Sequence, residues 1–170
     1  LERHGTSKLA TEQELSAITT LGFRGEAIPS IGSVSQLTIT SRPVDKPLGT
    51  QVVLHYGKLT KAHEIGCGYG TTCEIRNLFG NIPARRKFLR TVRTELGHIE
   101  EVVKSYGLCY PEATIILRID GKDAVFLDRS LSPSQRLGQI MHYDGSFIQV
   151  GNGDATAEKG VSGYLIPPEK

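Results

Sequence analysis

The sequence has 170 residues, a net charge of +2 and 38% hydrophobic residues, enough for one domain or for one domain and part of a second. No apolar run approaches the ~20 residues that span a bilayer. The three cysteines, an odd number without metal-ligand spacing, favour a reduced intracellular protein over a disulfide-stabilised secreted one. The chain begins with Leu1 rather than Met, so we expect a piece of a longer protein.

The first third of the chain predicts two short helices around a glycine-containing loop. Residues 11–14, Thr-Glu-Gln-Glu, match a capping box and predict a short helix. The loop 20–25 reads Thr-Leu-Gly-Phe-Arg-Gly. A second helix is expected over 26–31, where only the first turn accepts Pro29. The alternation in 35–41 then predicts a half-buried strand.

The middle of the chain predicts strands followed by helix. Segment 50–65 predicts a hairpin that turns at Gly57, and 72–78 predicts another strand. From 84 to 106 the apolar residues are spaced by three and four, which predicts a helix. Thr94 is a possible cap for a second helix within that range.

The last third predicts a hairpin, a helix and two more strands. Asp120-Gly121 is a strong hairpin signal, and Ser132-Pro133 is a good helix start. Strands are expected at 113–119, 124–127, 146–150 and 161–166. This mixture predicts an α+β protein with a domain boundary near 128–133.

The loop 20–25 raises the first functional question, because glycines before a helix N-terminus let backbone N–H groups face an anion. It is neither a G-x-x-x-x-G-K-[ST] phosphate loop nor a G-x-G-x-x-G that follows a strand. From these residues alone an ordinary turn is favoured, and a phosphate loop stays an alternative.

Thr6, Ser7 and Lys8 form a second candidate for phosphate binding. They place two hydroxyls and an ammonium side by side, a set that suits phosphate oxygens or a cation, although such a tripeptide is more often a solvated loop. No histidine or cysteine lies at metal-ligand spacing, and no local nucleophile signature is present. We therefore expect no metal site formed by these side chains.

A basic stretch between Asn81 and Arg93 is the third candidate. On one continuous helix Arg86, Arg90 and Arg93 would share a face and could neutralise a DNA backbone. A solvated face balanced by later glutamates is an equally good interpretation of the spacing. The stretch has no acidic residue, and its basic residues are Arg85, Arg86, Lys87, Arg90 and Arg93.

Three strings in order resemble successive motifs of the MutL family of DNA mismatch repair proteins, whose ATPase is of the GHKL type. They are RHGTSKL (3–9), LGFRGEAI (21–28) and GTTCEIRNLFGNIPARRKFLRT (70–91). The PARRKFL string separates this family from other GHKL ATPases. Gly5 stands where Ala is usual and Gly80 where an aromatic residue is common, and we expect both to be tolerated.

The resemblance implies an α+β fold in two parts. Residues 1–130 would form part of a GHKL ATPase sandwich, a mixed sheet with helices on one face, including the ATP lid. Residues 131–170 would begin a second α/β domain, the transducer of the ribosomal-protein-like type.

The resemblance also implies site residues. Thr71 would lie near the adenine of ATP, and Arg86, Arg90 and Arg93 would lie in a DNA-binding region. The remaining ATP-binding residues would close over the triphosphate, and they are Thr6, Ser7, Lys8, Leu21, Gly22, Phe23, Arg24, Gly25 and Glu26.

The cofactors implied are ATP and Mg²⁺. The general-base Glu and the Mg²⁺-binding Asn of the family are expected upstream of Leu1, so no catalytic residue is assigned within the chain. The partners implied are DNA, a second MutL-type subunit in an ATP-dependent homo- or heterodimer, a mismatch-recognition protein and downstream repair enzymes, with no membrane. The setting would be the cytoplasm or nucleoid of a bacterium, or a eukaryotic nucleus.

Two other functions stay open from the sequence: a DNA-binding or interaction module without ATPase activity, and another GHKL ATPase such as a type II topoisomerase subunit. An E-x-x-x-N helix upstream would favour the ATPase over the module.

We predict that these 170 residues alone do not hydrolyse ATP at the rate of the complete protein. Without a base to orient water and an amide to hold Mg²⁺, attack on the γ-phosphate lacks its organising groups. Phosphate release from the purified chain tests this, and turnover at the rate of the complete protein would contradict it.

Overall fold

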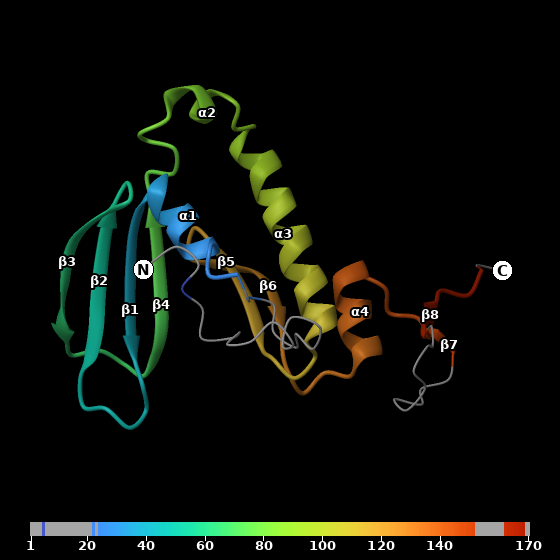
Figure 1. Ribbon diagram of the computed structural model, residues 1–170. Coiled ribbons are helices and arrows are strands. Elements are labelled where there is room, and N and C mark those ends of the chain that lie inside the picture. The colour runs from blue at the N-terminus through green and yellow to red at the C-terminus, as the bar shows by residue number, and fades with distance from the viewer. Residues whose placement is uncertain (1–4, 6–21, 23, 152–161, 169–170) are drawn as a thin grey trace. The chain divides into compact units, whose positions relative to one another are not determined.

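The computed structural model describes residues 5, 22, 24–151 and 162–168, and the chain divides into two compact units, 1–89 and 90–170. Both units combine helices with antiparallel strands, which confirms the α+β class (Figure 1). None of the helices in the described ranges is long and apolar enough to cross a membrane. The helix expected near 11–19 lies outside the described residues. The domain boundary expected near 130 stays a prediction.

The first unit is built on a four-stranded sheet in the order β3-β2-β1-β4. All pairings among these strands are antiparallel, where the resemblance implied a mixed sheet. The reason is that β1, β2 and β3 follow one another as a meander, and the chain then returns to the free side of β1. The elements are α1 (Ala27–Ser33), β1 (Gln36–Arg42), β2 (Gly49–His55), β3 (Lys58–Ile65), β4 (Gly70–Arg76) and α2 (Pro83–Lys87).

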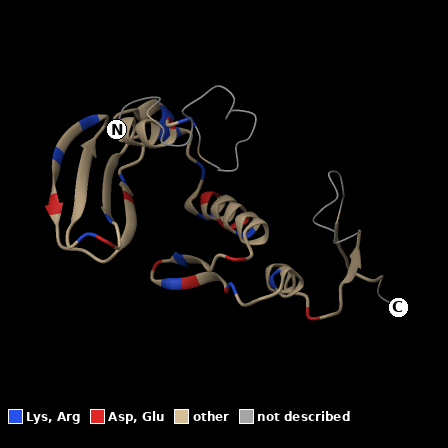
Figure 2. Cartoon of the chain, turned by 60° about the horizontal axis from the view of Figure 1, so that its bottom comes forward, with Lys and Arg blue, Asp and Glu red and all other residues tan. Residues whose placement is uncertain are grey.

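The β2–β3 hairpin turns where the sequence predicted. Tyr56 and Gly57 have φ values of 48° and 84°, so both central residues are left-handed. Two such residues give a turn whose twist matches that of the flanking strands. The outermost strand, β3, carries the charges seen as blue and red segments in Figure 2, which is typical of a protected sheet edge.

The two faces of this sheet differ in character. Leu37 and Leu54 are cross-strand partners, 1% and 6% exposed, and a Cβ at Gly32 of α1 would lie 3.4 Å from both side chains. α1 therefore covers this end of one face. On the opposite face the side chains are mainly polar, and Gln51 Nε2 donates to Thr40 Oγ1 there at 3.0 Å. Strand alternation thus produced the half-buried sheet that the sequence predicted.

The second unit contains a long helix, a hairpin, a shorter helix and a small two-stranded sheet. The β5–β6 hairpin turns at Asp120 and Gly121, with φ values of 49° and 78°, as predicted. Leu127 is 2% exposed and its side chain closely approaches Gly107. The elements are α3 (Val92–Cys109), β5 (Ile115–Ile119), β6 (Lys122–Leu127), α4 (Pro133–Met141), β7 (Ile148–Val150) and β8 (Gly163–Leu165).

The helix predicted over 84–106 is two helices, and the break lies earlier than Thr94. Thr91 has an extended backbone and caps α3, with its hydroxyl accepting from Thr94 N at 3.3 Å. Glu95 Oε1 also accepts from Arg90 N at 2.9 Å. These bonds satisfy N–H groups at a new helix start, so capping prevailed over the apolar periodicity. α4 starts at the predicted Ser-Pro pair, and Ser132 and Gln135 form a capping box there.

Candidate functional site

Two of the predicted ATP-lid motifs meet at a pair of glycines. A Cβ placed on Gly25 would clash with the carbonyl oxygen of Gly5, and Gly25 has a φ of +65°. Both the close approach and the left-handed backbone require glycine at this position. The motifs RHGTSKL and LGFRGEAI, separated by eleven residues of sequence, are therefore adjacent in space at this point.

The other predicted lid residues are only partly described. Arg24 Nε lies 3.2 Å from Glu26 Oε2 in an ion pair at the surface, and Glu26 occupies the N-cap position of α1. Pro29 is the third residue of α1, within the first turn where its missing N–H has no helical partner. The predicted residues outside the described part of the chain are Thr6, Ser7, Lys8, Leu21 and Phe23.

Thr71 lies on β4 and contacts a hydroxyl of the neighbouring strand. Its Oγ1 is 2.8 Å from Ser41 Oγ, and the two residues are Cα partners in the β1–β4 ladder. Because side chains alternate and this ladder has no bulge, Ser41 faces the same side of the sheet as Leu37. The Ser41–Thr71 pair is thus on the face that α1 covers, at the other end of the strands.

An aliphatic surface separates α1 from the Ser41–Thr71 pair. Ile39, Val52 and Cys73 are successive partners across β2, β1 and β4 on this face. Ile39 and Val52 are half-buried and Cys73 is exposed. The face therefore runs from α1, over partly exposed apolar side chains, to two hydroxyls.

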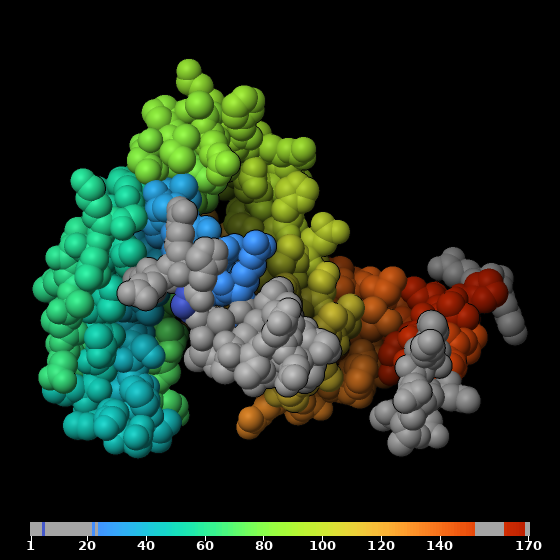
Figure 3. Space-filling model, in the orientation of Figure 1, coloured from blue at the N-terminus to red at the C-terminus, as the bar shows by residue number. Residues whose placement is uncertain are grey.

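The basic residues do not form one helical stripe. Arg86 lies on α2, Arg90 lies between the helices, and Arg93 lies in the first turn of α3. The prediction that the three arginines share one helix face is therefore wrong. Arg86 also belongs to the first unit, and Arg90 and Arg93 to the second. All three are exposed, and the α2 segment is visible at the surface in Figure 3.

The α2 segment also presents an apolar side chain to solvent. Phe88 is 85% exposed, directly after three consecutive basic residues. The guanidinium carbon of Arg85 lies 5.9 Å from the centre of the Phe79 ring, a cation–π contact that fixes this arginine at the start of α2.

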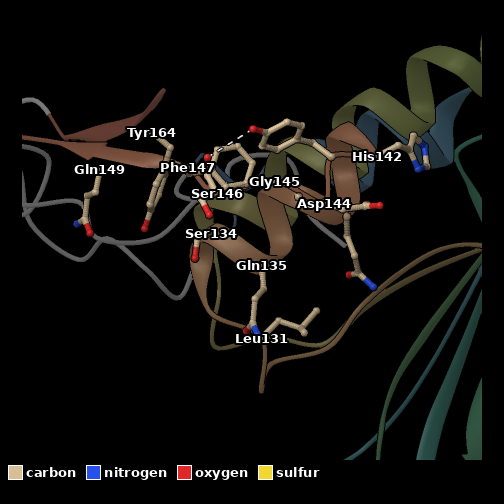
Figure 4. Close-up of a pocket in the computed structure, with 13 residues that line it drawn as sticks. Leu131, Ser134, Gln135, His142, Asp144, Gly145, Ser146, Phe147, Gln149 and Tyr164 are labelled. Atoms are coloured by element: carbon tan, nitrogen blue, oxygen red, sulfur yellow. Dashed lines mark hydrogen bonds between the residues drawn. The ribbon is translucent and has the colours of Figure 1, made fainter. Parts of the chain in front are cut away.

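A separate groove of about 730 Å³ in the second unit contains none of the predicted site residues. Tyr143 and Tyr164 both make edge-to-face contacts with Phe147 beside it, and Tyr143 donates to Ser146 O at 3.5 Å (Figure 4). Among the described residues no three His, Cys, Asp or Glu side chains come together as metal ligands. Neither feature assigns chemistry to this unit.

The chain is similar to bacterial proteins named DNA mismatch repair protein MutL. It is 43% identical to that of Solibacter usitatus over 139 residues, which is 82% of this chain and 21% of the relative. It is 44% identical to that of Xanthomonas oryzae over 145 residues, 85% of this chain and 23% of the relative. The chain belongs to the MutL family. It spans about a fifth of the length of these MutL relatives, and no family model matches it.

Solved structures place the fold within the MutL ATPase region. The chain aligns with the Aquifex aeolicus MutL ATPase domain complexed with ADP, with a TM-score of 0.74, 23% identity, and coverage of 95% of this chain and 62% of the other. Another structure of the Aquifex aeolicus MutL ATPase domain gives a TM-score of 0.64 at 21% identity, covering 94% of this chain and 58% of that one. The partial GHKL fold implied by the MutL resemblance is therefore confirmed.

Ser41, which contacts the predicted site residue Thr71, was not singled out from the sequence. Its hydroxyl is the partner of Thr71, but the two lie 30 positions apart. The only signal was its place at the end of a predicted strand, four residues after Leu37 and so on the same face. The position of Ser41 on a strand does not by itself identify Thr71 as its neighbour. That pairing becomes known only from the β1–β4 register of this MutL chain.

Proposed function

We propose that this chain is part of a MutL protein that binds and hydrolyses ATP, dimerises on ATP binding, binds DNA and couples mismatch recognition to later repair steps. The observation that carries the proposal is the contact between Gly5 and Gly25, because it joins the two lid motifs at the start of α1. The ADP bound by the Aquifex aeolicus relative supports a nucleotide as the ligand.

In this proposal the adenine lies over Ile39 and Val52 with its polar edge toward Thr71. The phosphates lie at the other end, against backbone N–H groups of Gly22 to Gly25 and beside Thr6, Ser7 and Lys8. Glycine at position 25 allows that close backbone approach, and N–H groups before a helix favour anions. The lid residues exclude water and hold the phosphate chain.

Mg²⁺, when bound to ATP in such sites, neutralises charge that develops on the phosphates. The described carboxylates and histidines do not gather into a group that fits this ion. We therefore assign no Mg²⁺ ligand or catalytic base to the described residues, and propose that they lie elsewhere in the complete protein.

Arg86, Arg90 and Arg93 are proposed to contact the DNA backbone. All three side chains are exposed, and no ion pair is found for them among the described residues. Exposed basic side chains of this kind neutralise phosphates without reading sequence. The nearest acidic side chain in sequence, Glu95, is hydrogen-bonded to Arg90 N and so belongs to the start of α3.

The remaining parts of the proposal concern the whole protein. ATP binding would order the lid and favour a dimer with the same or another MutL-type subunit, a disorder-to-order switch. Residues 1–130 would form the ATPase part and residues 131–170 the beginning of the transducer. The dimer would act on DNA in the bacterial cytoplasm or nucleoid, together with a mismatch-recognition protein and downstream repair enzymes.

Reversing two charges tests the DNA part of the proposal. In the complete protein, Arg86→Glu with Arg90→Glu is expected to weaken DNA binding by at least about 10-fold at low salt. The slope of log affinity against log salt should become shallower by roughly 2, since each phosphate contact contributes about 0.9. The measurement is a salt titration of DNA affinity with and without a non-hydrolysable ATP analogue.

The control makes the same change in net charge elsewhere. Lys58→Glu with Lys61→Glu alters two exposed residues of β3, away from α2 in sequence and on the edge of the sheet. We expect this variant to keep the salt slope of the parent protein. Equal slopes for all three proteins would show that the basic segment does not contact DNA.

A further inference from the structure

The C-terminal end of α1 is held by donors from two other parts of the first unit. The last carbonyls of a helix have no helical partner and must be satisfied from outside. Gly32 O accepts from Gly57 N at 2.8 Å in the β2–β3 turn. Ser33 O accepts from Asn81 Nδ2 at 3.0 Å, and the next carbonyl, Val34 O, accepts from Phe79 N at 2.7 Å. Segment 77–81 is therefore bonded directly to the helix that follows the proposed phosphate loop.

Segment 77–81 has an unusual backbone. Asn77 and Phe79 have φ values of 50° and 58°, and a left-handed conformation is uncommon for a bulky residue such as Phe79. Such residues persist only where the surrounding structure holds them, and they concentrate at switches and ligand sites. Here the bonds to α1 supply part of that support.

Tyr56 provides the rest of the support. Its hydroxyl donates to Asn77 O at 3.4 Å, and a Cβ on Gly80 would clash with that same hydroxyl. Gly80, which stands where the family commonly has an aromatic residue, thus leaves room for Tyr56. The segment is consequently fixed both by the hairpin turn and by α1.

The basic helix begins immediately after this segment. Ile82 is the N-cap of α2, and Ile82 N donates to Phe79 O at 3.0 Å. Arg86 N donates to Ile82 O at 3.1 Å, and Arg85 lies over the ring of Phe79. The direction in which α2 presents its arginines therefore depends on the conformation of residues 79–82.

We propose that Asn81 is a positioning residue that ties the basic segment to α1. A change at Gly25, on nucleotide binding, moves the seven-residue α1, and the bonds from Asn81 and Phe79 pass that movement to α2. Because the left-handed residues 77 and 79 are held by α1 and the hairpin turn, segment 77–81 follows α1 when the helix moves. This inference rests on the proposed function, because it needs both a nucleotide and DNA as ligands.

The test uses the complete protein, a non-hydrolysable ATP analogue and a short DNA duplex. The quantity measured is the ratio of the DNA dissociation constants without and with the analogue. Asn81→Ala is expected to bind the analogue with an affinity within about 2-fold of the parent. Its ratio of DNA dissociation constants is expected to be about 5-fold closer to one than the ratio of the parent. General destabilisation would weaken DNA binding equally without and with the analogue, and would leave the ratio unchanged.

Gln51→Ala is the matched control. It also removes one amide donor, the one that bonds to Thr40 on the opposite face of the sheet, and it has no bond to α1. We expect it to keep the parent ratio. The inference is overturned if Asn81→Ala has the same ratio of DNA dissociation constants as the parent. It is also overturned if the parent binds both ligands but has a ratio of one. A parent that binds neither ligand overturns the proposed function itself.

Hydrogen exchange on the unaltered protein gives a second test that does not depend on a variant folding. The analogue is expected to slow exchange at the Phe79 and Gly57 amides together with the amides of 24–34. Slower exchange at 24–34 without any change at Phe79 overturns the inference.

Discussion

Replacing Arg136 by methionine is expected to destabilise the second unit by about 3–5 kcal/mol, because it leaves several backbone carbonyls without a donor. Arg136 is completely buried, and among the described residues its guanidinium donates only to backbone carbonyls. Nη1 donates to Gly107 O at 2.7 Å and Nη2 to Ala113 O at 2.6 Å. The remaining acceptors are Tyr110 O, Pro111 O and Asp128 O.

The loss of stability is large because the carbonyls belong to the backbone and remain in the variant after their donor has been removed. Each buried carbonyl left without a donor costs about 1–3 kcal/mol. They belong to the C-terminal end of α3, the connection to β5 and the end of β6, so one side chain joins three parts of the unit to α4. The helix end adds partial negative charge that favours a buried cation.

Urea unfolding of the chain, followed by circular dichroism, measures this effect. A loss of 3 kcal/mol moves the midpoint by at least about 1 M, because slopes for small proteins are about 1–3 kcal/mol per M. The control is Arg118→Met, which removes an exposed arginine paired with Asp123 at 2.6 Å and should cost less than about 1 kcal/mol. Equal midpoints for the two variants would show that the carbonyl cluster does not stabilise the unit.

The local elements were predictable from the sequence because their signals are local. The turns at Gly57 and Gly121 require a left-handed backbone, which glycine adopts easily. The start of α4 depends only on Ser132-Pro133 and the residues of its first turn. The end of α2 was not predictable in this way. The apolar period runs through the break at 88–91, and the cap at Thr91 prevailed over it.

Residues that act through distant partners were not predictable from patterns. Arg136 has a charged side chain next to the apolar Leu137, so periodicity places it toward solvent, yet it is the buried residue of α4. Its partners are carbonyls, which leave no mark in the sequence. The bond from Asn81 to Ser33 O crosses 48 positions, and it was hidden for the same reason.

The order of motifs carried the functional prediction further than any single motif. Alone, the loop 20–25 favoured an ordinary turn. The contact of Gly25 with Gly5 gives the order of motifs a physical meaning, since the two loops that the resemblance implied lie together meet at this point. What the family resemblance supplied was the pairing of the loops, which composition and periodicity do not contain.

Gly25→Ala is expected to lower nucleotide affinity by about 10-fold or more in the complete protein. A left-handed φ costs an alanine about 1–2 kcal/mol. We expect the loop of the free variant to relax out of this conformation, so the cost falls on nucleotide binding, where about 1.4 kcal/mol corresponds to a factor of ten in affinity. The added methyl group would also push against the Gly5 carbonyl and separate the two lid motifs. Fold stability should change little, because Gly25 precedes α1 and lies outside the sheet.

Calorimetric titration with ADP measures the affinity, and Gly68→Ala is the matched control. A Cβ on Gly68 meets nothing within 4 Å, and its backbone is not in the left-handed region. This control should bind ADP as the parent does. If Gly25→Ala bound ADP within about 2-fold of the control, the contact of Gly25 with Gly5 would not belong to the nucleotide site, and the phosphates would have to lie elsewhere. A selective loss in Gly25→Ala would support phosphates at the junction of the two lid motifs, where both the close approach and the left-handed backbone require glycine.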